Sequence, residues 1–276
     1  MKFPKITHLY KYYGFNTNSL SVLINNRVWF SKPATLNDPF DIDIDFASPM
    51  TPSSFKYMIQ VLKRQKGISR EITEQLEALE QEIPGQNLLN EMNEVITVKF
   101  RDDRKDWGVF CMCESYDSIL MWSHYADCHK GFCVQFIRNQ NNKLGNIEYT
   151  SPVSYSCEYP SPNPYKENGT QRIYDELFFT KAKCWEHEKE WRMLNEEGNI
   201  ELSLVGITDV SAIIFGLNMP EPQKETIINI LSDKQDIEYL QATKVRNKFQ
   251  IEIVKYHKIM AQPLYGLRMS REKPLL

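Results

Sequence analysis

The sequence predicts a mixed α+β fold, in which mainly antiparallel sheets surround a cleft and one helical segment is inserted. Two observations support this fold class. Short runs rich in aromatic and β-branched residues, typical of strands, recur along the chain. Between them, residues 53–104 carry apolar residues at spacings of three and four, as amphipathic helices do. We therefore predict a single α+β domain over residues 1–276 with a helical insertion at 53–104.

The composition limits the class of protein. The chain has 276 residues, of which 42% are hydrophobic and 12% aromatic, so it can bury a sizeable core. A net charge of −3 argues against a strongly basic nucleic-acid module, although it is compatible with a local basic groove. No apolar run reaches the roughly 18 residues that span a bilayer, and the N-terminus lacks an apolar signal segment. We expect no membrane partner, a cytoplasmic location and six reduced cysteines.

The N-terminal segment supplies the first predicted elements. Residues 7–13, THLYKYY, are dense in aromatics and predict a strand. A short helix follows, for which Asn18 or Ser19 is the expected cap, and two asparagines at 25–26 end it. Residues 27–31, RVWFS, predict a second strand.

The next segment is a turn-rich acidic loop, KPATLNDPF at residues 32–40, in which Asn37 can bond its own backbone. Its acidic residues and those just beyond it are Asp38, Asp41, Asp43 and Asp45. Alternating acids occur in calcium loops, but the glycine and the terminal glutamate of such loops are absent. We therefore expect no metal here.

Residues 53–104 contain three helical patterns, and Pro-Gly at 84–85 separates the second from the third. The segment is charged and poor in residues typical of catalysis. Two interpretations remain open, an insertion packed on a sheet edge and a lid that binds a partner.

The remainder of the chain returns to short strands. They are predicted at residues 107–113, 131–136, 153–157, 188–194, 212–215, 237–244 and 249–256, and helices at 118–126 and 220–231. The last two strands form a closing pair. Cys111 and Cys113 lie two residues apart and therefore share one face of their strand.

The chain is organised around the segment DELFFTKAKCWEHEKEWRML, which ends in an alternating strand. Alternation places Trp191 and Met193 on the packed face, with Glu188, Glu190 and Arg192 on the other. One interpretation is a solvated face with a modest ion pair. The other is a polar cleft, in which an arginine and an apolar wall tune the carboxylates as acids, bases or cation stabilisers.

Several other kinds of site are not supported. Ser123, His124 and Asp127 do not form a hydrolase triad, because neighbouring helical residues point about 100° apart. The Cys and His spacings are not those of zinc sites, and no phosphate-binding glycine motif is present. His124 is either a core histidine with a satisfied ring nitrogen or part of a helix lining a cleft opposite Glu190.

Four segments together resemble a bacterial family known as domain-of-unknown-function family 2971. They are LYKYYGFNTNSLSVLINNRVWFSKPATLNDPFD, MWSHYADCHKGFCVQF, KCWEHEKEWR and IIFGLNM, in this order and spacing. Within them NDPFD, MWSHYA and EKEWR are the specific motifs. The resemblance spans nearly the whole chain, and the family name implies no activity.

The layout is also similar to that of the ADP-ribosyltransferase superfamily, particularly toxins that modify DNA. This resemblance implies an ADP-ribosyltransferase-like core, with a His or Arg on a first strand, a Ser or Tyr near a second and a Glu on a later one. The matching catalytic positions are His8 or Tyr10, between which the choice stays open, with Ser31 and Glu190. The same resemblance implies a set of NAD-binding residues, namely Tyr12, Trp29, Asn37, Asp38, Trp122, His124, Glu188 and Arg192.

Three functions follow as hypotheses. The first is an NAD-dependent ADP-ribosyltransferase or NAD glycohydrolase, an intracellular toxin or phage-defence effector. It uses NAD as substrate, no metal, and a nucleic acid or protein as acceptor. Its carboxylate would stabilise the oxocarbenium-like ion formed when the nicotinamide bond breaks.

The second is a non-catalytic module that binds a nucleotide or nucleic acid through the same cleft. The third is a metal-dependent phosphodiesterase or nuclease, with Mg²⁺ held among several charged residues. These are Asp38, Asp41, Glu188 and Glu190, with Lys183 and Lys189. The oligomeric state stays open.

Overall fold

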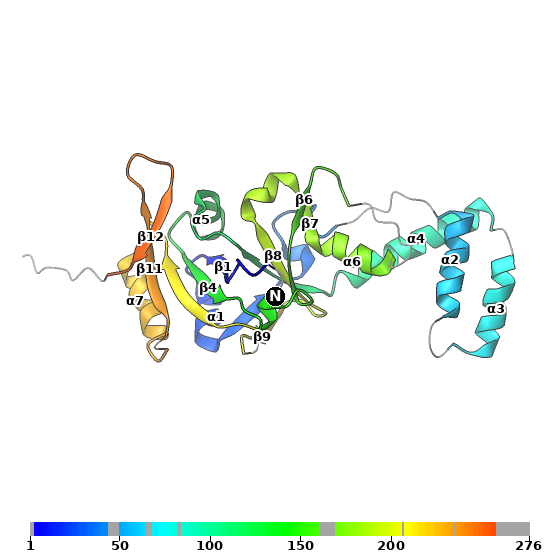
Figure 1. The fold of residues 1–276 in the computed structure, drawn as a ribbon, viewed down its shortest axis with the longest axis horizontal. Helices are drawn as coiled ribbons and strands as arrows, with labels where there is room; N and C mark the ends of the chain where they lie inside the picture. The colour runs from blue at the N-terminus through cyan, green and yellow to red at the C-terminus, as the bar shows by residue number, and fades with distance from the viewer. Residues whose placement is uncertain are drawn as a thin grey trace, which may run out of the picture.

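The computed structural model describes residues 3–43, 50–64, 68–81, 84–160, 169–205, 207–234 and 236–257. It is a mixed α+β fold built on an open, mainly antiparallel sheet (Figure 1). The strands are β1 (His8–Tyr13), β2 (Arg27–Phe30), β3 (Gly108–Cys113), β4 (Phe132–Ile137), β5 (Thr150–Pro152), β6 (Ser154–Ser156), β7 (Thr180–Ala182), β8 (Glu190–Asn195), β9 (Ile200–Ser203), β10 (Val210–Phe215), β11 (Glu238–Lys244) and β12 (Ile251–Lys255). The helices are α1 (Thr17–Asn25), α2 (Pro52–Lys63), α3 (Arg70–Gln81), α4 (Gln86–Asp103), α5 (Ile119–Tyr125), α6 (Gly169–Phe179) and α7 (Glu221–Ile230), with 3₁₀ turns η1 (Pro33–Thr35), η2 (Lys143–Gly145) and η3 (Lys183–Glu188).

The main sheet has the strand order β12-β11-β10-β4-β1-β3-β8-β5. Only β10 and β11 are parallel neighbours within it. Two small sheets, antiparallel β2–β9 and parallel β6–β7, flank it. In the described part of the chain, no helix is long and apolar enough to cross a membrane.

The main sheet opens between β1 and β3. β1 pairs with β4 along its whole length, and β3 does the same with β8, but β1 and β3 pair at Tyr10↔Cys113. Away from this pair, the backbone of β3 forms hydrogen bonds with groups outside the β1 backbone. Ser31 exchanges two backbone hydrogen bonds with Val109, and the Lys11 ammonium donates to the Cys111 carbonyl at 2.6 Å. The two halves of the sheet are therefore held together without closing, which leaves space between them.

Alternation along β1 sends its side chains into two separate cores. Leu9 packs with the larger core, which includes Phe110 and Trp191. Tyr10 and Tyr12 pack with the second core on the opposite face. Helices α1 and α7 contribute apolar residues to the first core, and α5 contributes to the second. The second core therefore places α5 beside the opening in the sheet.

The cap of α1 differs from the prediction. Asn16, with extended backbone angles, is the N-cap and accepts from the Ser19 N–H. Ser19 is the third helical residue, and its hydroxyl accepts from the Asn16 N–H in return. This reciprocal capping box places the cap at residue 16, so the expectation of a cap at Asn18 or Ser19 is wrong.

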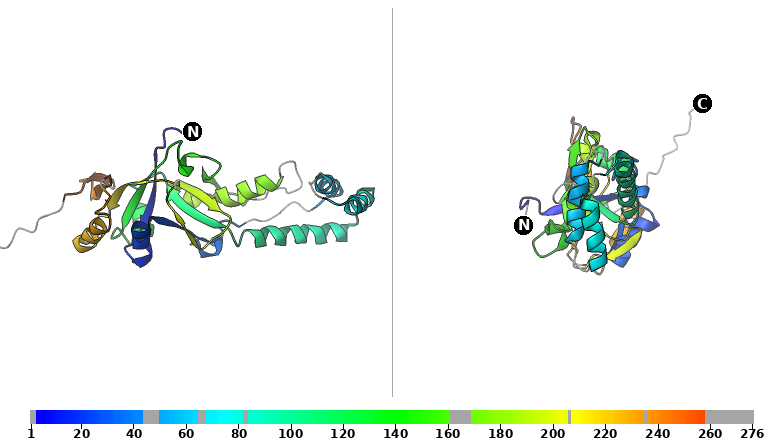
Figure 2. Two further views of the ribbon diagram at one scale, coloured as in Figure 1. Left: turned by 90° about the horizontal axis from the view of Figure 1, so that it is seen from below. Right: turned by 90° about the vertical axis from the view of Figure 1, so that its right-hand side faces the viewer.

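Helices α2, α3 and α4 account for most of the helical segment expected at residues 53–104. They form an arm that extends away from the sheet (Figures 1 and 2). The arm has a small core of its own, which includes Phe55, Ile59 and Leu89. At its base, Arg104 donates to the Ile42 carbonyl and pairs with the Asp43 carboxylate. A polar contact therefore joins the base of the arm to the loop after η1.

Candidate functional site

A cavity of about 280 Å³ lies where the two halves of the sheet separate. Strands β1, β3 and β8, helix α5 and the segment after β2 all contribute to its wall. Six of the residues expected to act in catalysis or NAD binding line it, namely Tyr10, Tyr12, Ser31, Asn37, Glu188 and Glu190.

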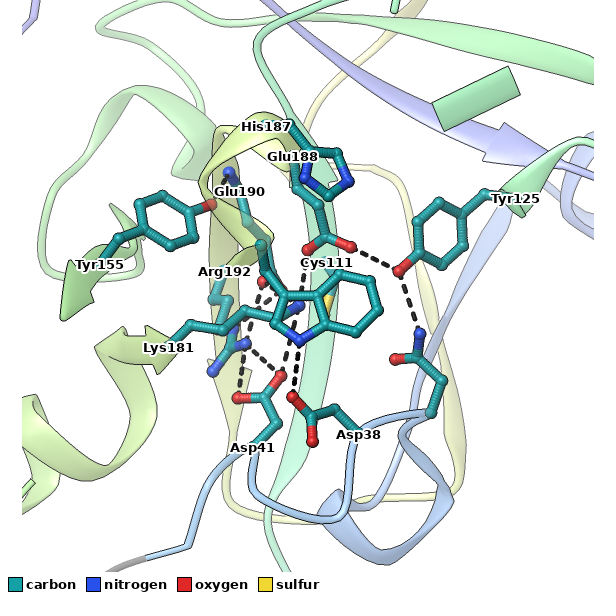
Figure 3. Close-up of polar contacts among 12 residues, drawn as sticks. Asp38, Asp41, Cys111, Tyr125, Tyr155, Lys181, His187, Glu188, Glu190 and Arg192 are labelled. Atoms are coloured by element: carbon teal, nitrogen blue, oxygen red, sulfur yellow. Dashed lines mark hydrogen bonds and ion pairs between the residues drawn. The ribbon is translucent and has the colours of Figure 1, made fainter. Parts of the chain in front are cut away.

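Five charged side chains form a buried cluster at this cavity, drawn in Figure 3. They are Asp41, Lys181, Glu188, Glu190 and Arg192, and none is more than 7% exposed. They come from four places in the chain: the loop after η1, β7, the end of η3, and β8. The interpretation of the Glu/Arg face as solvated surface is therefore wrong.

Arg192 is the fully buried centre of this cluster. Its Nε donates to Glu190 Oε1 at 2.8 Å, and its Nη2 donates to Glu190 Oε2 at 2.9 Å. Nη2 also contacts both Asp41 oxygens, at 2.8 and 2.6 Å, and Nη1 donates to the Phe178 carbonyl at 2.8 Å. A forked guanidinium suits this role because it can hold two carboxylates in fixed orientations.

Lys181 joins the three carboxylates from the other side. Its Nζ lies 2.5 Å from Glu188 Oε2, 3.1 Å from Glu190 Oε2 and 3.5 Å from Asp41 Oδ2. The same ammonium lies 5.2 Å from the centre of the Trp185 ring, within cation–π range. Lys181 therefore neutralises part of the negative charge that burial would otherwise make costly.

The cluster keeps Glu190 ionised. Burial acts to raise the pKa of Glu190, but the charge and hydrogen bonds of Arg192, with the charge of Lys181, lower it to about 2. Burial likewise opposes the charged form of the two cations, yet the nearby carboxylates raise the pKa of both Lys181 and Arg192. Formally, three carboxylates face two cations, which leaves one net negative charge.

The local backbone explains why two glutamates face the cavity. Glu190 and Arg192 are two residues apart on β8 and share one face. Glu188 ends η3 instead of continuing the strand, and Lys189 between them has a left-handed φ of 47°. That turn brings Glu188 to the same cavity as Glu190. The expectation of one strand face carrying all three charged residues is thus wrong for Glu188, although its side chain reaches the same place.

Polar side chains without a formal charge also line the cavity. The Tyr125 hydroxyl donates to Glu188 Oε1 at 2.5 Å and accepts from Asn37 Nδ2 at 3.1 Å. Burial, together with the Glu188 carboxylate, raises the pKa of Tyr125, so the phenol remains a donor. Cys111 and Cys113 also line the cavity, and burial raises the pKa of Cys113 to about 12. Both thiols are therefore held neutral.

A second cavity of about 510 Å³ adjoins the first. The two share four lining residues, Lys11, Tyr12, Ser31 and Tyr125. Trp29, which is 44% exposed, lines the second cavity. Burial lowers the pKa of Lys11, which lines both cavities.

Not all expected site residues reach these cavities. Arg192 and Asp38 are buried but do not line either cavity. Asp38 Oδ2 accepts a hydrogen bond from Trp185 Nε1 at 2.7 Å. His8 starts β1 and contacts the Thr7 hydroxyl at 3.0 Å, away from the lining residues. Between His8 and Tyr10, therefore, only Tyr10 lies at the cavity.

Two residues of α5 are placed differently from expectation. Trp122 is fully buried in the second core, where it packs edge-on against Tyr12 and donates to the Tyr116 carbonyl. His124 is exposed on α5, so neither the core histidine nor the cleft-lining histidine is correct. The short helix turns its Tyr125 toward the cavity instead.

Sequence reasoning missed Lys11, Tyr125 and Lys181. Lys11 is the one charged residue of an aromatic run, but Tyr125 and Lys181 stand beside other polar residues and carry no distinguishing local signal. Among the residues whose placement is described, no group of three or more His, Cys, Asp or Glu side chains could hold a metal ion.

No curated protein and no solved structure matches the chain significantly, so the resemblance to ADP-ribosyltransferases gains no support from them. One family model matches the middle of the chain. Residues 121–193, which include α5, Lys181 and the segment from Glu188 to Arg192, match the family described as "Protein of unknown function (DUF2971)".

Proposed function

We propose that this protein cleaves the nicotinamide–ribose bond of NAD, as an ADP-ribosyltransferase or an NAD glycohydrolase. The observation that carries the proposal is the buried cluster beneath the first cavity. The formal charge of the cluster is −1, and all three of its carboxylates, Asp41, Glu188 and Glu190, line the wall of the cavity. Buried carboxylates at the wall favour positive charge that develops directly beside them, in a ligand or in a transition state. NAD offers both, in its nicotinamide ring and in the ribosyl cation formed as the ring leaves.

The residues present suit the steps of this reaction. The bond between the ribose C1′ and the nicotinamide nitrogen breaks, and its electron pair stays with nicotinamide, which leaves as a neutral molecule. The ribose then carries positive charge, which the ionised Glu190 stabilises. Water or an acceptor group forms the new bond to C1′, and its proton passes to the Glu188 carboxylate.

Arg192 and Lys181 act on this chemistry through Glu190. Their hydrogen bonds hold the carboxylate in one orientation and keep its pKa low. A fixed carboxylate needs no reorganisation when positive charge develops beside it. Tyr10 and Tyr12 supply aromatic surface to the same cavity, on which a nicotinamide ring can stack.

The second cavity suits the remainder of a dinucleotide. The first cavity alone is near the lower end of the roughly 300–1,000 Å³ typical of ligand pockets. Lys11 lines both cavities, and in this proposal its ammonium pairs with the diphosphate that links the two halves of NAD. Trp29 then offers a ring surface for adenine in the second cavity.

The nuclease alternative has less support from the same contacts. All four oxygens of Asp41 and Glu190 already accept hydrogen bonds from Arg192 or Lys181. A magnesium ion would have to displace these partners. Lys183, considered for that role, is instead half-exposed and pairs with Glu186.

The proposal is tested with purified protein, NAD and chromatographic detection of nicotinamide. We expect the wild type to release nicotinamide and Glu190→Gln to lose at least 100-fold in rate, since about 2.7 kcal/mol of transition-state stabilisation corresponds to that factor. Rates are compared at a temperature at which circular dichroism shows both proteins folded. Glu186→Gln is the matched control, because it removes an exposed carboxylate from the same segment.

The possible results separate the hypotheses. Release of nicotinamide by the wild type and the control, but not by Glu190→Gln, supports the transferase or glycohydrolase. Binding of NAD without release would support a non-catalytic nucleotide-binding module. No binding at millimolar NAD by calorimetry, and no nicotinamide, would refute the proposal.

A further inference from the structure

We propose that the β11–β12 hairpin binds single-stranded nucleic acid through the cationic and aromatic residues at its tip. The tip is defined as residues 244–249, KVRNKF. This surface is separate from the two cavities described above, and its binding does not depend on the cleavage of NAD.

The first observation is a local concentration of positive charge. Lys244, Arg246 and Lys248 are all exposed and occupy three of six consecutive positions, with no acidic residue among them. None of the three forms an ion pair with any residue that the structure describes. The whole chain carries a net charge of −3, so this cluster contrasts with the rest of the molecule. Unpaired cations spaced along a ribbon are suited to the phosphates of a nucleic-acid backbone.

The second observation is an aromatic ring held in solvent. Phe249 is fully exposed, although a phenylalanine gains free energy from burial. The turn that carries it is ordered. The Val245 N–H donates to the Gln250 carbonyl at 3.0 Å, the Lys248 N–H donates to the Val245 carbonyl at 3.2 Å, and Asn247 takes the left-handed conformation. The backbone therefore presents Phe249 outward, with its ring free to stack on a base.

The third observation is the position of the hairpin. Ala242 and Ile251, near its tip, belong to the same core as Met121 and Trp122 of α5. Helix α5 in turn directs Tyr125 into the first cavity. The hairpin loop and α5 point to the same side of the molecule (Figure 1). The tip is therefore carried by strands that pack against α5.

These features favour a single strand over a duplex. A stacking ring needs the face of an unpaired base, which a continuous duplex covers with neighbouring pairs. Three cations and one ring make a small contact, so the expected affinity depends strongly on salt.

Binding is measured by fluorescence anisotropy with labelled 20-nucleotide DNA and RNA single strands, without NAD, over a series of salt concentrations. We expect Phe249→Ala to weaken binding roughly 5- to 150-fold, from the contribution of about 1–3 kcal/mol of one stacked base. Phe249→Tyr, which keeps an aromatic ring, should bind the single strands as tightly as the wild type. Arg246→Ala/Lys248→Ala should lower the slope of log Kd against log salt by about 1.4, from two lost phosphate contacts at about 0.7 each.

The matched control is Lys99→Ala/Arg101→Ala, which removes two exposed cations from α4 on the arm. It should bind like the wild type. The proposal is overturned if the wild type binds neither probe at 20 mM salt or if the control loses as much as the hairpin variants. It is also overturned if the hairpin variants lose binding only to vesicles containing phosphatidylserine. Nicotinamide release by Phe249→Ala is measured separately, so a failure of either proposal leaves the other testable.

Discussion

Replacing Glu190 by glutamine keeps the size of a buried side chain and removes its charge. In the folded protein the pKa of Glu190 is about 2, against an ordinary value of 4.5. At about 1.4 kcal/mol per pH unit, this difference corresponds to roughly 3 kcal/mol of folding free energy. The carboxylate is almost fully buried, so solvent screens little of this energy.

The sign follows from the lowered pKa. A carboxylate whose pKa falls on folding stabilises the native state fully above its unfolded pKa and loses that contribution as pH falls toward the folded value. Glutamine approximates the protonated carboxyl. We therefore expect Glu190→Gln to unfold more easily than the wild type by about 3 kcal/mol at pH 7, with the difference shrinking below pH 4.5 and vanishing near pH 2.

The assay is urea denaturation of both proteins between pH 7 and pH 3, followed by the fluorescence of the buried Trp122 and Trp191. Glu186→Gln, which removes an exposed carboxylate, should differ from the wild type by less than about 1 kcal/mol. A Glu190→Gln difference that is below 1 kcal/mol at pH 7, or that is the same at every pH, would refute the reasoning. Glu190 would then not be a charged member of the cluster.

Three further predictions concern the cluster, the cavity wall and the arm. Lys181→Met leaves three buried carboxylates with a single cation and should cost about 3–5 kcal/mol at pH 7, measured by urea denaturation. Tyr125→Phe removes the donor to the Glu188 carboxylate and should cost about 1.5–3 kcal/mol, and an unchanged melting temperature would contradict the hydrogen bond. Replacing the chain between Asp43 and Arg104, whose side chains pair at the base of the arm, with a short Gly/Ser linker should preserve the near-ultraviolet circular dichroism of the body. Loss of that spectrum would show that the arm supports the main sheet.

Much of the secondary structure follows from local pattern. The aromatic run at residues 7–13 predicts β1, and the three-and-four spacing at 53–104 predicts α2, α3 and α4. Both patterns show which face of a helix or strand is apolar. Residues close together in the sequence define that face, so it can be read without knowing the tertiary structure. The same reasoning placed Glu190 and Arg192 on one face of a strand, as they are in β8.

Errors arose where a local signal fits more than one position. Serine is a common N-cap residue, but Asn16, which has an extended backbone, is the N-cap of α1. Ser19 is the third helical residue and forms the second hydrogen bond of the capping box. The sequence predicts a core or cleft position for His124, but the orientation of α5 exposes His124, buries Trp122 and turns Tyr125 to the cavity.

By itself, the sequence determined that the Glu190 carboxylate and the Arg192 guanidinium lie on the same face of a strand. Side chains two residues apart always share a face, whatever the strand pairs with. Only the tertiary structure decided that this face is buried. Asp41, Lys181 and Tyr125 reach it from other parts of the chain, and Tyr10 and Ser31 face it across the opening between β1 and β3. An alternating charged strand has the same local pattern in water as in a cavity, and the difference depends on what else folds against it.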